Sequence, residues 1–194
     1  MNGIAAIEMQ PRVDRGKMGV WWFLASEVMT FGGFISVYVL YRLASGGSWA
    51  EMSAYVSMPI GAFNTLVLLT SSLTMVKAVS AIEDEDRQGT RNFLGLTVLL
   101  GLLFLVVKGV EYSIEIHHGF TPRSHSFWGF YYTLTGLHAL HIVGGIIANF
   151  VLFILAVRGS LWLGSRQQVE SVGLYWHFVD IIWIFLFPLL YLSY

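Results

Sequence analysis

The sequence predicts an all-α protein, a polytopic bundle of five transmembrane helices. Of the 194 residues, 56% are hydrophobic, against about 45–50% in soluble domains, and the mean hydropathy is +0.66. The apolar residues gather in five runs, each long enough for a hydrocarbon core about 30 Å thick, which needs about 20 helical residues. The runs also lack the period-2 alternation of barrel strands.

The first three predicted spans follow a polar N-terminal tail, residues 1–18, which is expected on the cytoplasmic side. The first span covers residues 19–43. The second covers 58–81 and opens with Pro59, a residue suited to the first turn of a helix. The third covers 93–114 and contains two charged residues, which are taken up below.

The last two predicted spans cover residues 127–157 and 169–192. The fourth run is longer than a span requires, so it is expected to tilt or to project from the membrane. No linker is long enough to divide the chain. Residues 19–194 are therefore expected to form one transmembrane domain.

The distribution of basic residues predicts the direction of the spans. Eight lie in segments that share one side: Arg12, Arg15, Lys17, Lys77, Arg87, Arg91, Arg158 and Arg166. The other side has Arg42 and Arg123. Because cytoplasmic loops carry the excess of lysine and arginine, the N-terminus is expected in the cytoplasm and the C-terminus outside.

Composition and motifs exclude several classes of function. The net charge of -1, without a basic stripe, gives no case for nucleic-acid binding. The absence of cysteine removes thiolate metal sites and the Cys-x-x-Cys-His haem attachment. Phosphate-binding loops and His-Glu-x-x-His are also absent. The sequence thus predicts no catalytic, cofactor-binding or metal-binding residue in this chain, and its expected partners are lipid and other membrane proteins.

Several ionisable residues lie within the predicted spans. Placing such a side chain in hydrocarbon costs several kcal/mol unless it is paired or hydrated. They are Glu27, Lys108, Glu111, His138, His141, His177 and Asp180. A rise of about 1.5 Å per residue puts Glu27, His177 and Asp180 at comparable depth, with His141 near the middle of its span. We expect Glu27, His141, His177 and Asp180 to form one buried polar cluster.

The third span has a separate charged pair, Lys108 and Glu111, placed three residues apart in the half of the membrane that is expected to face outward. Residues three apart share one face of a helix. A local ion pair is one interpretation of this spacing. A functional carboxylate at Glu111 is the other.

Three roles remain open for the embedded histidines: a hydrogen-bonded structural role, a proton relay with Glu27 or Asp180, and haem or metal ligation. Small residues are a separate signal. Gly32, Gly33, Gly144 and Gly145 lie in the first and fourth spans, and small residues allow close helix contact in membranes. We expect these glycines at helix–helix contacts.

Five strings resemble, in order, segments of haem–copper oxidase subunit III. They are WWFLASEVMTFGGF (21–34), FNTLVLLTSS (63–72), VEYSIEI (110–116), FWGFYYTLTGLHALHIVGG (127–145) and LYWHFVDIIWIFLF (174–187). Together they extend over nearly the whole chain. The last two are the most specific, since Tyr-Trp-His-Phe-Val-Asp is not a generic apolar pattern.

The resemblance implies a non-catalytic subunit III of a terminal cytochrome c oxidase in aerobic respiration, docked against subunit I in a complex with subunit II. It implies that the family stabilises subunit I, holds phospholipid and supports proton uptake, with haem and copper in the partner subunits. It also implies the bacterial cytoplasmic membrane, and a larger respiratory supercomplex is compatible with it. The residues that match the family's buried polar positions, none of them a haem or copper ligand there, are Glu27, Glu111, His141, His177 and Asp180.

Two departures from the family stand out. Many relatives have two further helices ahead of the span 19–43, and subunit I is a candidate to supply them. Lys108 stands where relatives often carry an uncharged polar residue. Two alternatives share the fold: subunit III of a quinol oxidase and the accessory protein of nitric-oxide reductase. A free-standing haem-binding electron carrier is a third, and it predicts a Soret band in the isolated chain.

Overall fold

The computed structural model describes residues 15–161 and 166–192, and of residues 15–17 it describes the backbone. Most of the predicted tail 1–18, including Arg12, therefore lies outside the described residues. The described part folds into α1 (Arg15–Ala44), α2 (Ser48–Ser53), α3 (Met58–Glu83), α4 (Arg87–His117), α5 (Ser126–Val157) and α6 (Arg166–Tyr191). Five of these helices, all but α2, are long and apolar enough to cross a membrane, which confirms the predicted fold class.

Polar caps place helix starts outside the apolar runs. α4 begins at Arg87, ahead of the predicted start at 93, because the side chain of Asp86 accepts a hydrogen bond from the backbone N–H of Gly89 at 2.9 Å. The start of α5 is capped by His125, whose Nδ1 accepts from the N–H of Phe127 at 3.1 Å. Hydropathy locates the hydrocarbon part of a helix, whereas the caps set its ends.

The short helix α2 lies outside the predicted spans. It follows Gly47, whose positive φ of 98° is a conformation that favours glycine. Trp49 anchors it: the side chain is buried, and its indole Nε1 donates to Ser126 Oγ at 3.0 Å. The same ring lies 5.1 Å, centroid to centroid, from that of Tyr38. α2 thus ties the end of α1 to the start of α5.

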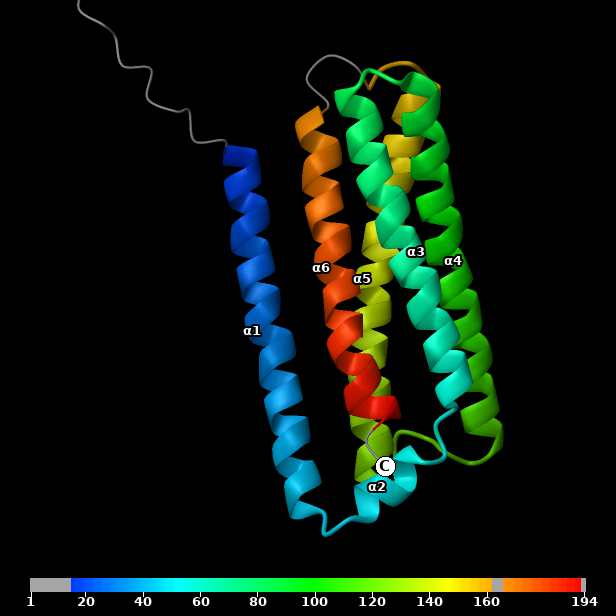
Figure 1. The fold of residues 1–194 in the computed structure, drawn as a ribbon. Helices are drawn as coiled ribbons and strands as arrows, with labels where there is room; N and C mark the ends of the chain where they lie inside the picture. Colours follow the sequence, from blue (N-terminus) through cyan, green and yellow to red (C-terminus); the bar gives the residue numbers. More distant parts are fainter. Residues whose placement is uncertain (1–14, 162–165, 193–194) are drawn as a thin grey trace, which may run out of the picture.

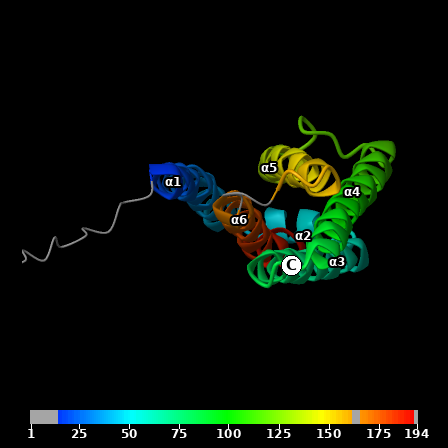
Figure 2. The same cartoon turned by 90° about the horizontal axis from the view of Figure 1, so that it is seen from above.

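The long helices run antiparallel in chain order (Figure 1). α3, α4, α5 and α6 pack together, and α1 lies at the edge of this group beside α6 (Figure 2). In the most apolar window of α1, 17% of residues are buried, against 44% in that of α3. α1 is therefore a peripheral helix whose larger part is left for lipid or a partner.

The interior is aromatic and polar, and the outside is apolar. The largest fully buried side chains include those of Trp128, Trp176 and Trp183. Met29 is 79% exposed and Leu140 is 68% exposed, each within a candidate span. This is the distribution expected of a bundle that faces hydrocarbon and keeps its polar groups inside.

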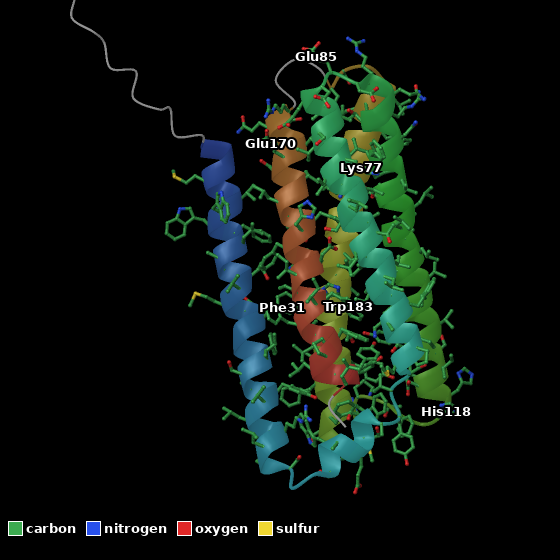
Figure 3. The ribbon with its side chains drawn as sticks, viewed as in Figure 1. Phe31, Lys77, Glu85, His118, Glu170 and Trp183 are labelled. Atoms are coloured by element: carbon green, nitrogen blue, oxygen red, sulfur yellow. The ribbon has the colours of Figure 1, made fainter. Side chains whose placement is uncertain are left out.

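The two ends of the bundle carry different polar groups. Glu85 and Glu170 lie at one end and His118 lies at the other (Figure 3). At the first end, Arg166 of α6 pairs with Glu83 of α3, and its Nε donates to Glu170 Oε1 at 2.8 Å. The loops with the predicted excess of basic residues are therefore brought to the same end.

Candidate functional site

Glu27 and His141 meet between α1 and α5. The Nε2 of His141 lies 3.1 Å from Glu27 Oε2, and both side chains are nearly buried, with 15% and 16% of their surface exposed. On its other side, Nδ1 lies 2.9 Å from the backbone carbonyl oxygen of Leu137. An aromatic ring packs against the pair: Phe31 meets the His141 ring edge-on at 5.3 Å between centroids.

This geometry allows the two side chains to share a proton. A carbonyl oxygen can only accept, so Nδ1 of His141 carries a hydrogen. Nε2 then either donates to a Glu27 carboxylate or accepts from a Glu27 carboxylic acid. In either arrangement a hydrogen bond joins the two side chains, and the two arrangements need no change in the backbone.

His177 and Asp180 form a second polar group, on α6. The Nδ1 of His177 lies 2.8 Å from Ser72 Oγ on α3, and 4.0 Å from Asp180 Oδ2. The second distance is too long for a hydrogen bond. Within the part of the chain that the structure describes, no hydrogen bond links this group to Glu27 or His141. The four residues predicted as one cluster therefore lie in two separate polar groups.

His177 also borders an apolar groove between α1 and α6. The groove has a volume of about 570 Å³ and includes Trp21, Leu24 and Phe178 in its lining. The side chain of His177 is 30% exposed, whereas that of Asp180 is 4% exposed. The histidine can thus be reached from the groove, and the carboxylate behind it is enclosed.

Lys108 and Glu111 form the ion pair that their spacing suggests, with Nζ donating to Oε2 at 2.9 Å. Both residues are almost fully buried. Tyr131 of α5 and Tyr191 of α6 complete the group, donating to Glu111 Oε1 at 3.0 and 2.7 Å. Lys108 also donates to both tyrosine hydroxyls. This charged cluster (Lys108, Glu111, Tyr131 and Tyr191) joins α4, α5 and α6.

The sequence did not reveal the two tyrosines of the charged cluster. Tyr191 is 80 residues from Glu111 along the chain, so no local spacing signals their contact. Glu115 was also missed. It lies four residues after Glu111 on α4, is 2% exposed and has one carboxylate oxygen without a hydrogen-bond partner among the described residues.

The third embedded histidine, His138, is separate from these polar groups. It is fully buried, and its ring stacks on that of Trp183 at 5.1 Å between centroids. The described residues contain no group of three or more His, Cys, Asp or Glu placed to hold a metal ion. At the end of the bundle, Nδ1 of His117 contacts the backbone oxygen of Ser113 at 2.6 Å.

The four predicted packing glycines have different surroundings. A Cβ on Gly145 would lie 2.5 Å from the Trp176 ring, and one on Gly144 would lie 3.3 Å from Tyr175 Oη. Among the described residues, Gly32 and Gly33 have no neighbouring atom within 4 Å of that position. A Cβ added to Gly101, which the sequence did not single out, would lie 2.9 Å from Ile146 and from Trp176. Close contact within the chain is thus made at Gly101 and Gly145.

Comparison with known proteins gives concordant results. A family model described as cytochrome c oxidase subunit III matches residues 6–193. A probable cytochrome c oxidase subunit 3 of Mycobacterium leprae is 39% identical over 185 residues, covering 93% of this chain and 89% of the relative. Cytochrome c oxidase subunit 3 of Corynebacterium diphtheriae is 34% identical over 183 residues, with the same coverage. That of Bacillus sp. PS3 is 33% identical over 176 residues, covering 90% of this chain and 84% of the relative.

Proposed function

The chain belongs to the cytochrome c oxidase subunit III family and is a subunit of a terminal oxidase, and from this premise we propose that it stabilises subunit I and supports proton uptake through Glu27 and His141. The observation that carries the proposal is the 3.1 Å contact between His141 Nε2 and Glu27 Oε2, which lies between two candidate spans. The names of the relatives favour the cytochrome c branch over the quinol oxidase and nitric-oxide reductase alternatives.

The proposed partners are oxidase subunits I and II, which supply the haem and copper, in the cytoplasmic membrane of a bacterium. The chain itself contributes no catalytic group in this proposal. Glu27 and His141 hold a proton at defined atoms, Oε2 and Nε2. Phe31 packs edge-on against the His141 ring, and the Tyr175 hydroxyl donates to the backbone oxygen of His141 at 3.0 Å, which holds this turn of α5 against α6.

Purification in mild detergent tests the proposed assembly. A haem-containing partner is expected to co-purify with a tagged copy of the chain, and the eluate is expected to have oxidase activity. The chain freed of its partners is expected to be colourless. A Soret band in the isolated chain would instead support the haem-carrier alternative, and an eluate without an oxidase would contradict the proposed partners.

Substituting Glu27→Gln is expected to reduce the number of turnovers before the oxidase inactivates by several-fold, with unchanged haem spectra. Glutamine can still donate an amide hydrogen to Nε2 of His141, so the helix contact is kept, but it has no titratable proton. The measurement is oxygen consumption followed to inactivation. Glu51→Gln, at an exposed site on α2, is the matched control. Equal lifetimes for both variants and wild type would refute the proton role.

The absence of native cysteine allows a direct test of the proposed orientation. Ser124 and Ser160 lie exposed in the α4–α5 and α5–α6 connections, at opposite ends of the bundle. An impermeant maleimide is expected to label the Ser124→Cys variant in intact cells, and the Ser160→Cys variant only after permeabilisation, because the latter loop is on the side with the basic residues. The reverse pattern would invert the topology.

A further inference from the structure

Tyr175 of α6 contacts both of the helices that carry the Glu27–His141 pair. α6 lies beside α1 and beside α5 (Figure 2). The Tyr175 hydroxyl donates to the backbone oxygen of His141 on α5 at 3.0 Å. The ring of the same residue packs against that of Phe23 on α1, with the two ring centroids 6.0 Å apart. One side chain of α6 is thus in contact with α5 at His141 and with α1 next to Glu27.

On α5, the hydroxyl contact is made at the turn from which the imidazole of His141 projects. The ring is tied to its own helix, because Nδ1 donates to the backbone oxygen of Leu137 at 2.9 Å. A shift of this turn relative to α6 would therefore move Nε2 with it. Gly144 leaves room for the hydroxyl, since a Cβ at that position would lie 3.3 Å from Tyr175 Oη.

On α1, the ring contact lies one turn before Glu27. Phe23 and Glu27 are four residues apart and so share one face of the helix. α1 is also the least buried of the candidate spans, with 17% of its most apolar window buried. Its polar contact with α6, from the Tyr38 hydroxyl to the backbone oxygen of Leu189, lies about 16 Å further along the axis. The ring contact is therefore placed to set the position of Glu27 relative to α6.

We propose that Tyr175 is a positioning residue for the Glu27–His141 pair. It holds α5 through its hydroxyl and α1 through its ring, and in this way it sets the 3.1 Å separation of His141 Nε2 and Glu27 Oε2. Proton transfer between two such atoms requires that they stay within hydrogen-bond distance. The inference rests on the proton role proposed for Glu27, and it names the residue of α6 on which that role depends.

Tyr175→Phe tests the positioning directly, because it removes the hydroxyl and keeps the ring. The readout is the ¹⁵N signal of His141 Nε2 in the full-length chain labelled on histidine, assigned by its loss in His141→Gln. We expect this signal to move towards its position in Glu27→Leu, where no carboxyl group faces Nε2. Tyr132→Phe is the matched control, since that hydroxyl also donates to a backbone oxygen, that of Phe120 at 2.8 Å. A signal that Tyr175→Phe leaves unchanged would overturn the proposal.

A double variant separates positioning from a general loss of stability. Tyr175→Phe alone is expected to reduce the number of turnovers before the oxidase inactivates by several-fold, whereas Tyr132→Phe is not. In a Glu27→Gln background, Tyr175→Phe is expected to cause no further loss, because residues that act through one contact are not additive. Losses that multiply would show a structural effect only and would overturn the positioning role.

Failure of the proposed function has a different outcome. A Glu27→Gln variant with the lifetime of the wild type would refute the proton role of that carboxyl group. The ¹⁵N signal of His141 would still decide whether Tyr175 holds the two side chains together, because it reports the contact and not the turnover.

Discussion

Lys108→Met is expected to lower the free energy of unfolding by about 3–5 kcal/mol, the usual cost of removing one partner of a buried ion pair. The variant leaves Glu111 buried without its counter-charge, in contact with Tyr131 and Tyr191. Since the charged cluster joins three helices, the loss acts on the packing of α4, α5 and α6 together. Denaturation of the purified chain in SDS gives the free energy, and retention of the chain on the oxidase during heating gives the functional consequence.

A second substitution separates charge from packing. Replacing both members, Lys108→Met with Glu111→Leu, is expected to restore most of the stability, because a buried pair exchanged for apolar residues of similar volume is often neutral. Tyr131 and Tyr191, whose hydroxyls lie 3.4 Å apart, can then pair with each other. Lys77→Met, at an exposed site on α3, is the control and is expected to change stability by about 0.5 kcal/mol or less. A stable single variant would show that the pair is not needed.

Gly145→Ala is expected to destabilise the bundle by about 1–3 kcal/mol through overpacking. The added methyl would lie 2.5 Å from the Trp176 ring. That ring cannot withdraw easily, because its Nε1 is bonded to Ser71 and its six-membered ring also packs close to Gly101. Loss of the chain from the oxidase at a lower temperature than wild type is the measurement.

Gly33→Ala is the matched control for this prediction. No atom lies within 4 Å of its added methyl in the described part of the chain, so stability of the isolated chain is expected to stay unchanged. If Gly145→Ala and Gly33→Ala behaved alike in the isolated chain, close contact between α5 and α6 would not determine stability.

Much of the fold could be predicted because a bilayer imposes a minimum length on apolar helices. Local pairs could also be read from helical spacing, as Lys108 and Glu111 show, since residues three apart share a face. The predicted depths of Glu27 and His141 in the membrane agreed well enough to suggest that the two side chains meet. Depth does not specify which way a helix faces, however. For that reason His177 was grouped with Glu27, whereas the structure bonds it to Ser72 on α3.

The glycines illustrate the same limit of sequence patterns. Gly32, Gly33, Gly144 and Gly145 look alike as pairs of small residues within spans. One pair lies on an open face of α1, and the other lies under Trp176 and Tyr175. The rotation of each helix about its axis makes this difference, and it depends on side chains from distant parts of the chain.

The peripheral position of α1 has a consequence for biogenesis. α1 leaves the ribosome before α5 and α6, yet two of its polar contacts are made with those helices: His141 for Glu27, and the backbone oxygen of Leu189 for the Tyr38 hydroxyl, at 3.0 Å. The Glu27 carboxyl group can therefore meet its partner on α5 only after α5 has been made. The described contacts of α1 are complete only once α6, which carries Leu189, has also entered the membrane.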